Sequence, residues 1–178
     1  REVASALATE LGATAYEKLA DVTANADVII TVVTNDAAMR AIYTNADDNL
    51  LQGASGKVFI DCATLSPAIH REVSAAQTAA GAQNLEACMA SSISHARSGE
   101  LYLMLAGDQA AYGANQQLIE DLSVNRRFIE GGRGRAAEVK ALVNMVMNIN
   151  TAGLAEGLGL AASLGHDLKT VSYTHLTL

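Results

Sequence analysis

Two residues, Lys140 and Asn144, have the types and the spacing that proton transfer needs. Lys140 is the only cation between Arg135 and His166, in a stretch made mostly of Ala, Leu, Val, Met and Asn. Residues four apart lie on one face of a helix, so the amide of Asn144 is expected beside the amine of Lys140. An amine with an orienting amide can donate a proton to a reacting oxygen.

A structural role for Lys140 fits the same pattern. A lysine can lay its methylene groups along a packed helix and extend its amine to water. A lone ammonium in an apolar helix is costly to bury unless it is paired or used. The residue types alone leave both interpretations open.

The elements that must position Lys140 form an α/β pattern. Strand-length apolar runs alternate with helical segments, which is typical of a mostly parallel sheet. Ser66 and Pro67 predict a helix start, with serine as the N-cap and proline in the first turn. Strands are predicted at residues 26–33, 57–62, 84–90, 101–106 and 126–130, and helices at 37–43, 66–81 and 108–122.

The predicted strands end in small or polar residues. The first three ends are Thr34-Asn35, Cys62-Ala63-Thr64 and Ala90-Ser91-Ser92. Ligands bind at the carboxyl ends of strands in parallel α/β sheets. These ends therefore predict a ligand site close to the backbone.

Composition excludes several other classes of function. The 178 residues carry a net charge of −7 with no basic cluster, which argues against nucleic-acid binding. No apolar run has the length of a membrane span, and no metal-ligand spacing occurs. Cys62 and Cys88 make no disulfide framework, so a cytoplasmic location is expected. They are interpreted as buried strand residues, because a Cys88–His95 hydrolase pair has no third orienting group.

Four segments, in order, resemble the β-hydroxyacid dehydrogenases, which include 3-hydroxyisobutyrate dehydrogenase and the glyoxylate and succinic semialdehyde reductases. The segments are V-I-I-T-V-V-T-N-D, F-I-D-C-A-T-L-S-P, E-A-C-M-A-S-S and K-A-L-V-N-M, which begin at residues 28, 59, 86 and 140. The resemblance covers nearly all of residues 1–170. It implies that Lys140 is the general acid/base and that Asn144 hydrogen-bonds the lysine or the substrate.

The resemblance also implies a cofactor, NAD or NADP. Val33 and Thr34 would lie against its ribose-phosphate region, and Thr64 against its nicotinamide end. Ser91 and Ser92 would bind the carboxylate of a small-molecule substrate, largely through backbone N–H groups. The implied reaction interconverts a small 3-hydroxyacid or 2-hydroxyacid and its aldehyde or semialdehyde, in a full-length parent that is a homo-oligomer.

The implied fold is an N-terminally truncated, Rossmann-like, mostly parallel sheet followed by the long first helix of an all-α domain. Its predicted limits are residues 1–131 for the partial dinucleotide-binding domain and 132–170 for the interdomain helix and the start of the all-α domain. Residues 171–178, V-S-Y-T-H-L-T-L, break the helical pattern with β-prone residues and are interpreted as a non-native tail. The family's opening strand and G-x-G-x-x-G turn would precede Arg1, so residues 1–178 are expected to bind the cofactor weakly and to be inactive.

The departures from the family pattern keep an alternative open. Ala63 and Ala90 replace serines, Cys88 replaces proline, and Ser91 replaces the first glycine of the substrate loop. A non-catalytic dinucleotide-binding or interaction protein on the same fold would tolerate these changes. The presence of Lys140 favours the enzyme, and it also argues against a relative that reduces imines.

Overall fold

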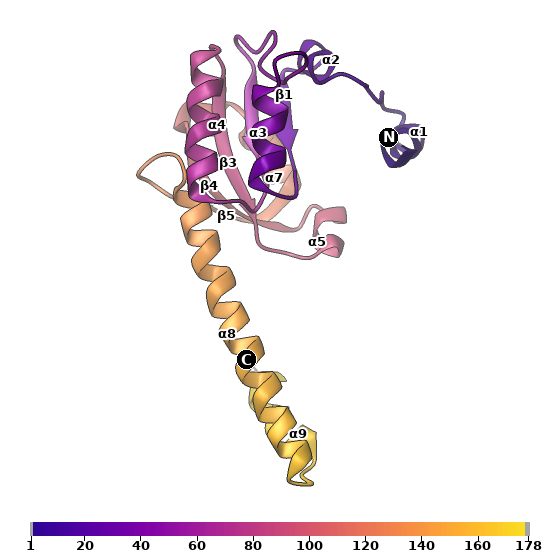
Figure 1. The fold of residues 1–178 in the computed structure, drawn as a ribbon, viewed down its shortest axis with the longest axis vertical. Helices are drawn as coiled ribbons and strands as arrows, with labels where there is room; N and C mark the ends of the chain where they lie inside the picture. The colour runs from indigo at the N-terminus through magenta and orange to yellow at the C-terminus, as the bar shows by residue number, and fades with distance from the viewer. Residues whose placement is uncertain (1, 177–178) are drawn as a thin grey trace. The chain divides into compact units, whose positions relative to one another are not determined.

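The chain divides into two compact units, residues 1–140 and 141–178, and each is described by itself. The computed structural model describes the backbone of residues 2–176 and the side chains of residues 2–172. The first unit contains a five-stranded sheet (Figure 1). Its strand order is β1-β2-β3-β4-β5. The strands are β1 Val28–Thr31, β2 Val58–Asp61, β3 Gln83–Met89, β4 Leu101–Gly107 and β5 Ser123–Phe128.

Most strand pairs in the sheet are parallel, as predicted. β1, β2 and β3 run in one direction, while β4 is antiparallel to β3 and parallel to β5. The carboxyl ends of β1, β2 and β3 therefore lie at one edge of the sheet, and those of β4 and β5 lie at the opposite edge. This topology determines which loops can share a ligand.

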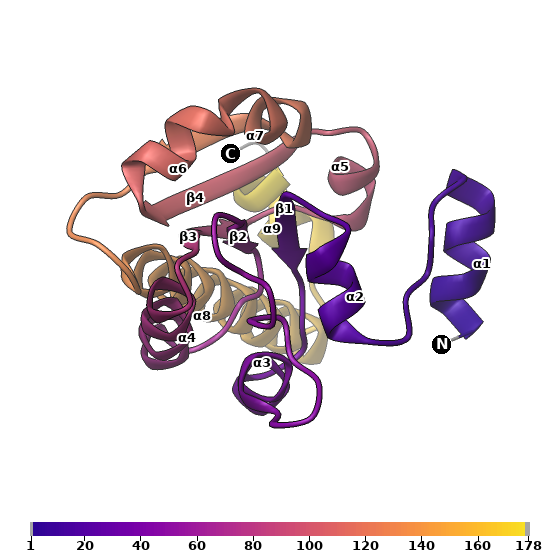
Figure 2. The ribbon, with the colours of Figure 1, turned by 90° about the horizontal axis from the view of Figure 1, so that it is seen from above.

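Helices cover both faces of the sheet (Figure 2). α3 and α4 lie on one face, and α6 and α7 lie on the other. The helices of the first unit are α1 Glu2–Leu11, α2 Leu19–Ala24, α3 Asp36–Thr44, α4 Pro67–Ala79, α5 Ile93–Arg97, α6 Gln109–Ala114 and α7 Gln116–Leu122. α8, Arg135–Ser163, begins in this unit.

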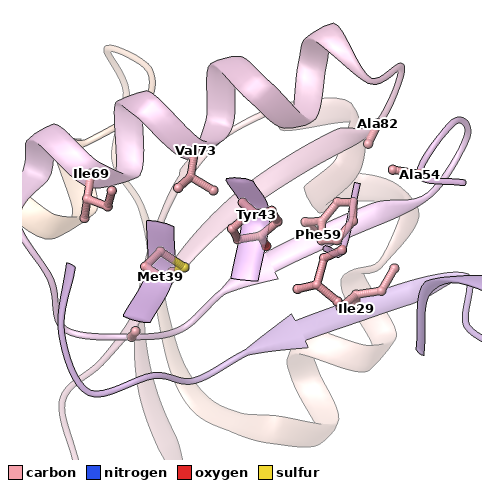
Figure 3. Packing of buried hydrophobic residues seen from close by; sticks show 10 residues of the cluster. Ile29, Met39, Tyr43, Ala54, Phe59, Ile69, Val73 and Ala82 are labelled. Carbon is pink, nitrogen blue, oxygen red and sulfur yellow. The ribbon is translucent and has the colours of Figure 1, made fainter. Parts of the chain in front are cut away.

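A buried cluster holds α3 and α4 against β1 and β2. Met39 and Tyr43 point from α3 toward Phe59 and Ile29 of the strands, and Val73 joins them from α4 (Figure 3). The rings of Tyr43 and Phe59 pack edge to face, with their centroids 5.6 Å apart. Fully burying each such side chain contributes about 2 kcal/mol. The cluster therefore fixes the two helices whose starts border the strand ends.

Several element limits differ from the prediction, and the end of β1 and the start of β5 illustrate why. β1 ends at Thr31 rather than Val33, because its parallel partner β2 ends at Asp61 and Val32 has no strand beside it. Apolar, β-branched residues continue past the paired region, so composition alone sets the end too late. β5 likewise begins at Ser123, directly after α7, rather than at Arg126.

The single helix predicted over residues 108–122 is two helices. Asn115 ends α6 and precedes α7, and its side-chain amide donates to the Ala111 carbonyl oxygen at 2.8 Å. Asparagine competes for backbone partners in this way and favours helix ends. The periodic apolar residues of both helices face the same core, so the apolar pattern alone does not reveal the break at Asn115.

The second unit contains the rest of α8 and α9, Leu168–Leu176. Residues 171–176 are helical in α9, so the expectation that β-prone residues break the helical pattern there is wrong. Residues 177 and 178 lie outside the described residues. The domain limits and the non-native origin of residues 171–178 stay predictions.

Candidate functional site

Three loops meet at the edge where β1, β2 and β3 end. They follow Thr31, Asp61 and Met89, the last residues of the three strands. The loop after β1 carries Val33, which packs in part against the buried cluster under α3 and α4, and Thr34, which is exposed. The predicted cofactor-binding residues of this loop therefore lie after the strand, where a ligand at the sheet edge could reach Thr34.

The loops after β1 and β2 are tied together by Asp36 and Ser66. The backbone N–H of Ser66 donates to Asp36 Oδ1 at 3.1 Å, and Ser66 Oγ donates to Asp36 Oδ2 at 2.5 Å. These hydrogen bonds hold the pKa of Asp36 below its ordinary value. The starts of α3 and α4, and with them the loops of Thr34 and Thr64, are thereby held in a fixed relation.

Thr64 is exposed, whereas the two residues before it are buried. His70 Nε2 lies 3.3 Å from the Ala63 carbonyl oxygen and holds this loop against the start of α4. Cys88 Sγ approaches the same carbonyl oxygen at 4.0 Å, which links the loop to β3. Thr64 therefore projects from a backbone that is fixed on both sides.

A buried carboxylate at the end of β2 supports this edge. Asp61 is only 3% exposed, and it accepts hydrogen bonds from Thr31 Oγ1 at 2.5 Å, Tyr43 OH at 2.9 Å and Gln77 Nε2 at 2.9 Å. Burial, followed by the charge of Asp61, raises the pKa of Tyr43, so the phenol stays a donor. This network was not predicted, because its members are scattered over four elements and share no spacing.

Ser91 and Ser92 are exposed in the loop after β3. Ser91 Oγ accepts from the N–H of Tyr102 at 3.0 Å and donates to the Ala90 carbonyl oxygen at 2.6 Å. Ser92 Oγ lies 2.7 Å from both Ser94 Oγ and His95 Nδ1. The hydroxyl groups are thus engaged locally, which fits the expectation that backbone N–H groups do most of the binding.

Lys140 is brought toward the end of β3 by the start of α8. Arg133 Nε donates to Asn84 Oδ1 at 2.9 Å, and the N–H groups of Gly134 and Ala137 donate to the carboxylate of Glu86. Cys88 lies two residues after Glu86 on β3, and the charge of Lys140 acts to lower the pKa of its thiol. The helix therefore follows β3 toward its carboxyl end, and Lys140 is half-buried there. Asn144 is also half-buried and follows one helical turn later in α8, as predicted.

The cysteines are buried strand-end and strand residues, as predicted. Burial is the main cause that raises the pKa of Cys62 and that of Cys88 to about 12. For Cys88 the charge of Glu86 adds to this effect and that of Lys140 opposes it. Thiols with such pKa values stay protonated at neutral pH and are poor nucleophiles. His95 is exposed and contacts Ser92, so the structure does not support a Cys88–His95 hydrolase pair.

Among the described residues, no group of His, Cys, Asp and Glu side chains could hold a metal ion. In the same part of the chain, no helix is long and apolar enough to cross a membrane.

Residues 1–131 match the protein-family model described as the NAD binding domain of 6-phosphogluconate dehydrogenase. The chain is 30% identical over 153 residues to the mitochondrial 3-hydroxyisobutyrate dehydrogenase of Homo sapiens, a match that covers 86% of this chain and 45% of that protein. It is also 30% identical over 152 residues to the cytokine-like nuclear factor N-PAC of Danio rerio, covering 85% of this chain and 33% of that protein.

A similar solved structure is that of Psf3 in complex with NADP+ and 2-OPP, with a TM-score of 0.83 and 27% identity. The similarity covers 93% of this chain and 59% of that one. The family model and this structure confirm the Rossmann-like fold, and the family model also confirms the predicted class of cofactor, a nicotinamide dinucleotide. The chain spans about half the length of the curated dehydrogenases that it matches.

Proposed function

We propose a function from the premise that this chain belongs to the β-hydroxyacid dehydrogenase family, with residues 1–131 in the family of NAD-binding domains of 6-phosphogluconate dehydrogenase. Its full-length parent is an NAD(P)-dependent oxidoreductase. The reaction interconverts a small 3-hydroxyacid, or a 2-hydroxyacid, and its aldehyde or semialdehyde. The observation that carries the proposal is the position of Lys140, half-buried beside the end of β3.

Lys140 is the general acid/base of the proposed reaction. In the reducing direction the aldehyde oxygen gains negative charge, and an ammonium group both stabilises that charge and donates the proton. In the oxidising direction the amine removes the hydroxyl proton. Asn144, one turn along α8, orients the lysine or the substrate.

The residues at the sheet edge fit a dinucleotide cofactor. Thr34 and Thr64 are exposed on loops that Asp36 and Ser66 tie together, at the carboxyl ends of parallel strands. In the proposed complex Val33 and Thr34 lie against the ribose-phosphate region, and Thr64 lies at the nicotinamide end. When bound, the nicotinamide supplies or accepts the hydride, and the protein supplies orientation and the proton.

The substrate carboxylate is proposed to bind at Ser91 and Ser92. Both residues are exposed, and their hydroxyl groups already have local partners, so backbone N–H groups provide most of the recognition. Ala90 removes a hydroxyl group that the family usually has in this loop. We therefore expect the preference among small hydroxyacids to differ from that of relatives that have the serine.

A second candidate is a non-catalytic dinucleotide-binding or interaction protein on the same fold. It is supported by Ala90 in the loop after β3, by Cys88 within β3, and by the similarity to a relative that is named as a nuclear factor. Lys140 favours the enzyme, because its ammonium has no structural ion pair among the described residues.

Oxidation of NADH and NADPH by the full-length parent, with glyoxylate, succinic semialdehyde and related aldehydes, separates the two candidates. Turnover of one of these aldehydes supports the enzyme. Cofactor binding without turnover of any aldehyde supports the non-catalytic protein. Light scattering of the same preparation tests the expected homo-oligomer, and fractionation of the source cells tests the expected cytoplasmic location.

A further inference from the structure

Glu86 places a carboxylate where a helix packed on a sheet normally has apolar side chains. It lies in the middle of β3, and its side chain is 3% exposed. Its neighbours at this interface include Cys88 and Met104 on the strands and Ala136 and Ala137 on α8. Burying an ionised carboxylate costs several kcal/mol unless its partners compensate for the lost water.

The partners of Glu86 are backbone groups at the start of α8. Gly134 N–H donates to Oε1 and Ala137 N–H donates to Oε2. Within the described part of the chain, no ion pair with Lys, Arg or His is found for Glu86. The first N–H groups of a helix lack partners within the helix, and the helix dipole favours an anion there. The carboxylate thus binds the end of the helix rather than a side chain on it.

Contacts on both sides of Glu86 relate α8 to β3. Two residues before Glu86 on the strand, Asn84 accepts from Arg133, which precedes the helix. Two residues after Glu86, Cys88 feels the charge of Lys140, which lies in the second turn of the helix. The helix and the strand advance together between these contacts. The helix advances about 4.5 Å from Ala137 to Lys140, and the strand advances about 6.6 Å from Glu86 to Cys88. Slippage of α8 by one turn would move Lys140 by about 5.4 Å, beyond the reach of a hydrogen bond.

The other contacts at the start of α8 fix its position less directly. The ion pair of Arg71 with Glu138 lies between partly exposed long side chains, which can follow a shifted helix. Arg133 also donates through its flexible side chain. The carboxylate of Glu86, by contrast, accepts from backbone N–H groups, those of Gly134 just before the helix and of Ala137 in its first turn.

We propose that Glu86 is a positioning residue for Lys140: its buried carboxylate holds the start of α8 in the register that places the lysine at the carboxyl end of β3. This inference rests on the proposed function, because the lysine must be catalytic for its position to matter to turnover. It predicts that activity and fold stability respond differently to changes at Glu86.

The decisive variants are Glu86→Met and Glu86→Asp in the full-length parent. Methionine has a similar length and removes the buried charge, so the variant is expected to fold. We expect kcat to fall by about a hundredfold in Glu86→Met, because a displacement of about 1 Å at a catalytic group can cost that much, while the KM for the cofactor stays within about twofold. Glu86→Asp keeps the charge and is expected to recover at least about a tenth of the wild-type kcat.

A matched control is Ser123→Ala. Ser123 is as buried as Glu86, and its Oγ donates to the Ile119 carbonyl oxygen, far from α8 in the hydrogen-bond network. Its loss is expected to lower stability without changing kcat. A Glu86→Met protein that is folded and has the wild-type kcat, in an enzyme that Lys140→Ala inactivates, would overturn the proposal.

Hydrogen exchange separates this inference from the proposed function. The amides of Gly134 and Ala137 are expected to exchange at least about tenfold faster in Glu86→Met than in the wild type, with amides at Ser123 unchanged. If Lys140→Ala is fully active, the proposed function fails, and the exchange result alone then decides whether Glu86 anchors α8. Unchanged protection at Gly134 and Ala137 would overturn the anchoring itself.

Discussion

The carboxylate of Asp61 accepts hydrogen bonds from three buried donors, and it has no ion pair among the residues that the structure describes. Thr31 comes from the neighbouring strand, Tyr43 from α3 and Gln77 from α4. A buried donor that loses its acceptor costs about 1–3 kcal/mol. Asp61 therefore couples both helices to the sheet next to the candidate cofactor edge.

Replacement of Asp61 by alanine is expected to destabilise the fold by about 3 kcal/mol or more, because three donors lose their acceptor. Urea unfolding of the chain measures this change. Asp27→Ala is the matched control, since Asp27 is exposed and its ion pair with Lys57 contributes little, about 0.5 kcal/mol or less. Equal effects of the two substitutions would contradict the assigned role of Asp61.

Ser66 gives a prediction that depends on pH. Its Oγ accepts from the Ile69 N–H as the N-cap of α4 and donates to Asp36, whose pKa is lowered mainly by Ser66. Because the pKa of Asp36 is lower in the folded state, its ionised carboxylate stabilises the fold at pH values above the unfolded pKa of about 3.9. This contribution disappears as the pH falls through the pKa that Asp36 has in the folded state. Ser66→Ala is expected to cost about 1 kcal/mol at pH 7 and less at pH 3. Denaturant unfolding at both pH values measures it, and a cost that does not depend on pH would exclude the link to Asp36.

Elements were predictable from the sequence where local chemistry marks their ends. Ser66 and Pro67 mark the start of α4, and the structure confirms both in those positions. The end of β1 was predicted too late, because it depends on where β2 stops pairing rather than on β-branched composition. The break at Asn115 has only a weak local signal.

The site was predictable in part for the same reason. Thr34, Thr64 and Ser92 follow strands, so a parallel sheet requires their loops to share an edge. The partners of Asp61 and Glu86 come from distant elements, and no spacing in the chain relates them. Pairings of this kind exist only once the tertiary packing is known.

Gly134 allows α8 to start close to α4. Its φ is +86°, and an added Cβ would lie 3.0 Å from the Pro67 carbonyl oxygen and 2.4 Å from Arg71 Nη1. Gly134→Ala is expected to destabilise the fold by about 1–3 kcal/mol through backbone strain. Gly113→Ala, in the open interior of α6, is the control and is expected to stabilise by about 0.5–1 kcal/mol. Thermal unfolding compares them, and a neutral Gly134→Ala would show that the approach of α8 to α4 is not constrained there.

At the scale of the whole molecule, the chain spans about half the length of the dehydrogenases that it matches. No G-x-G-x-x-G sequence, the usual phosphate-binding turn, occurs in residues 1–178. Titration of this chain with NADH and NADPH is therefore expected to show no tight binding. Micromolar affinity would contradict that expectation and show that the loops of Thr34 and Thr64 suffice to bind the cofactor.

The central claim is that Lys140 donates the proton, and kinetics of Lys140→Ala in the full-length parent test it most directly. Lys57→Ala is the matched control, because Lys57 directly precedes β2, at the edge opposite the candidate site. We predict that kcat falls by at least roughly a hundredfold in Lys140→Ala, with the fold intact, and stays near the wild-type value in Lys57→Ala. A folded Lys140→Ala enzyme with a near-normal kcat would contradict the account.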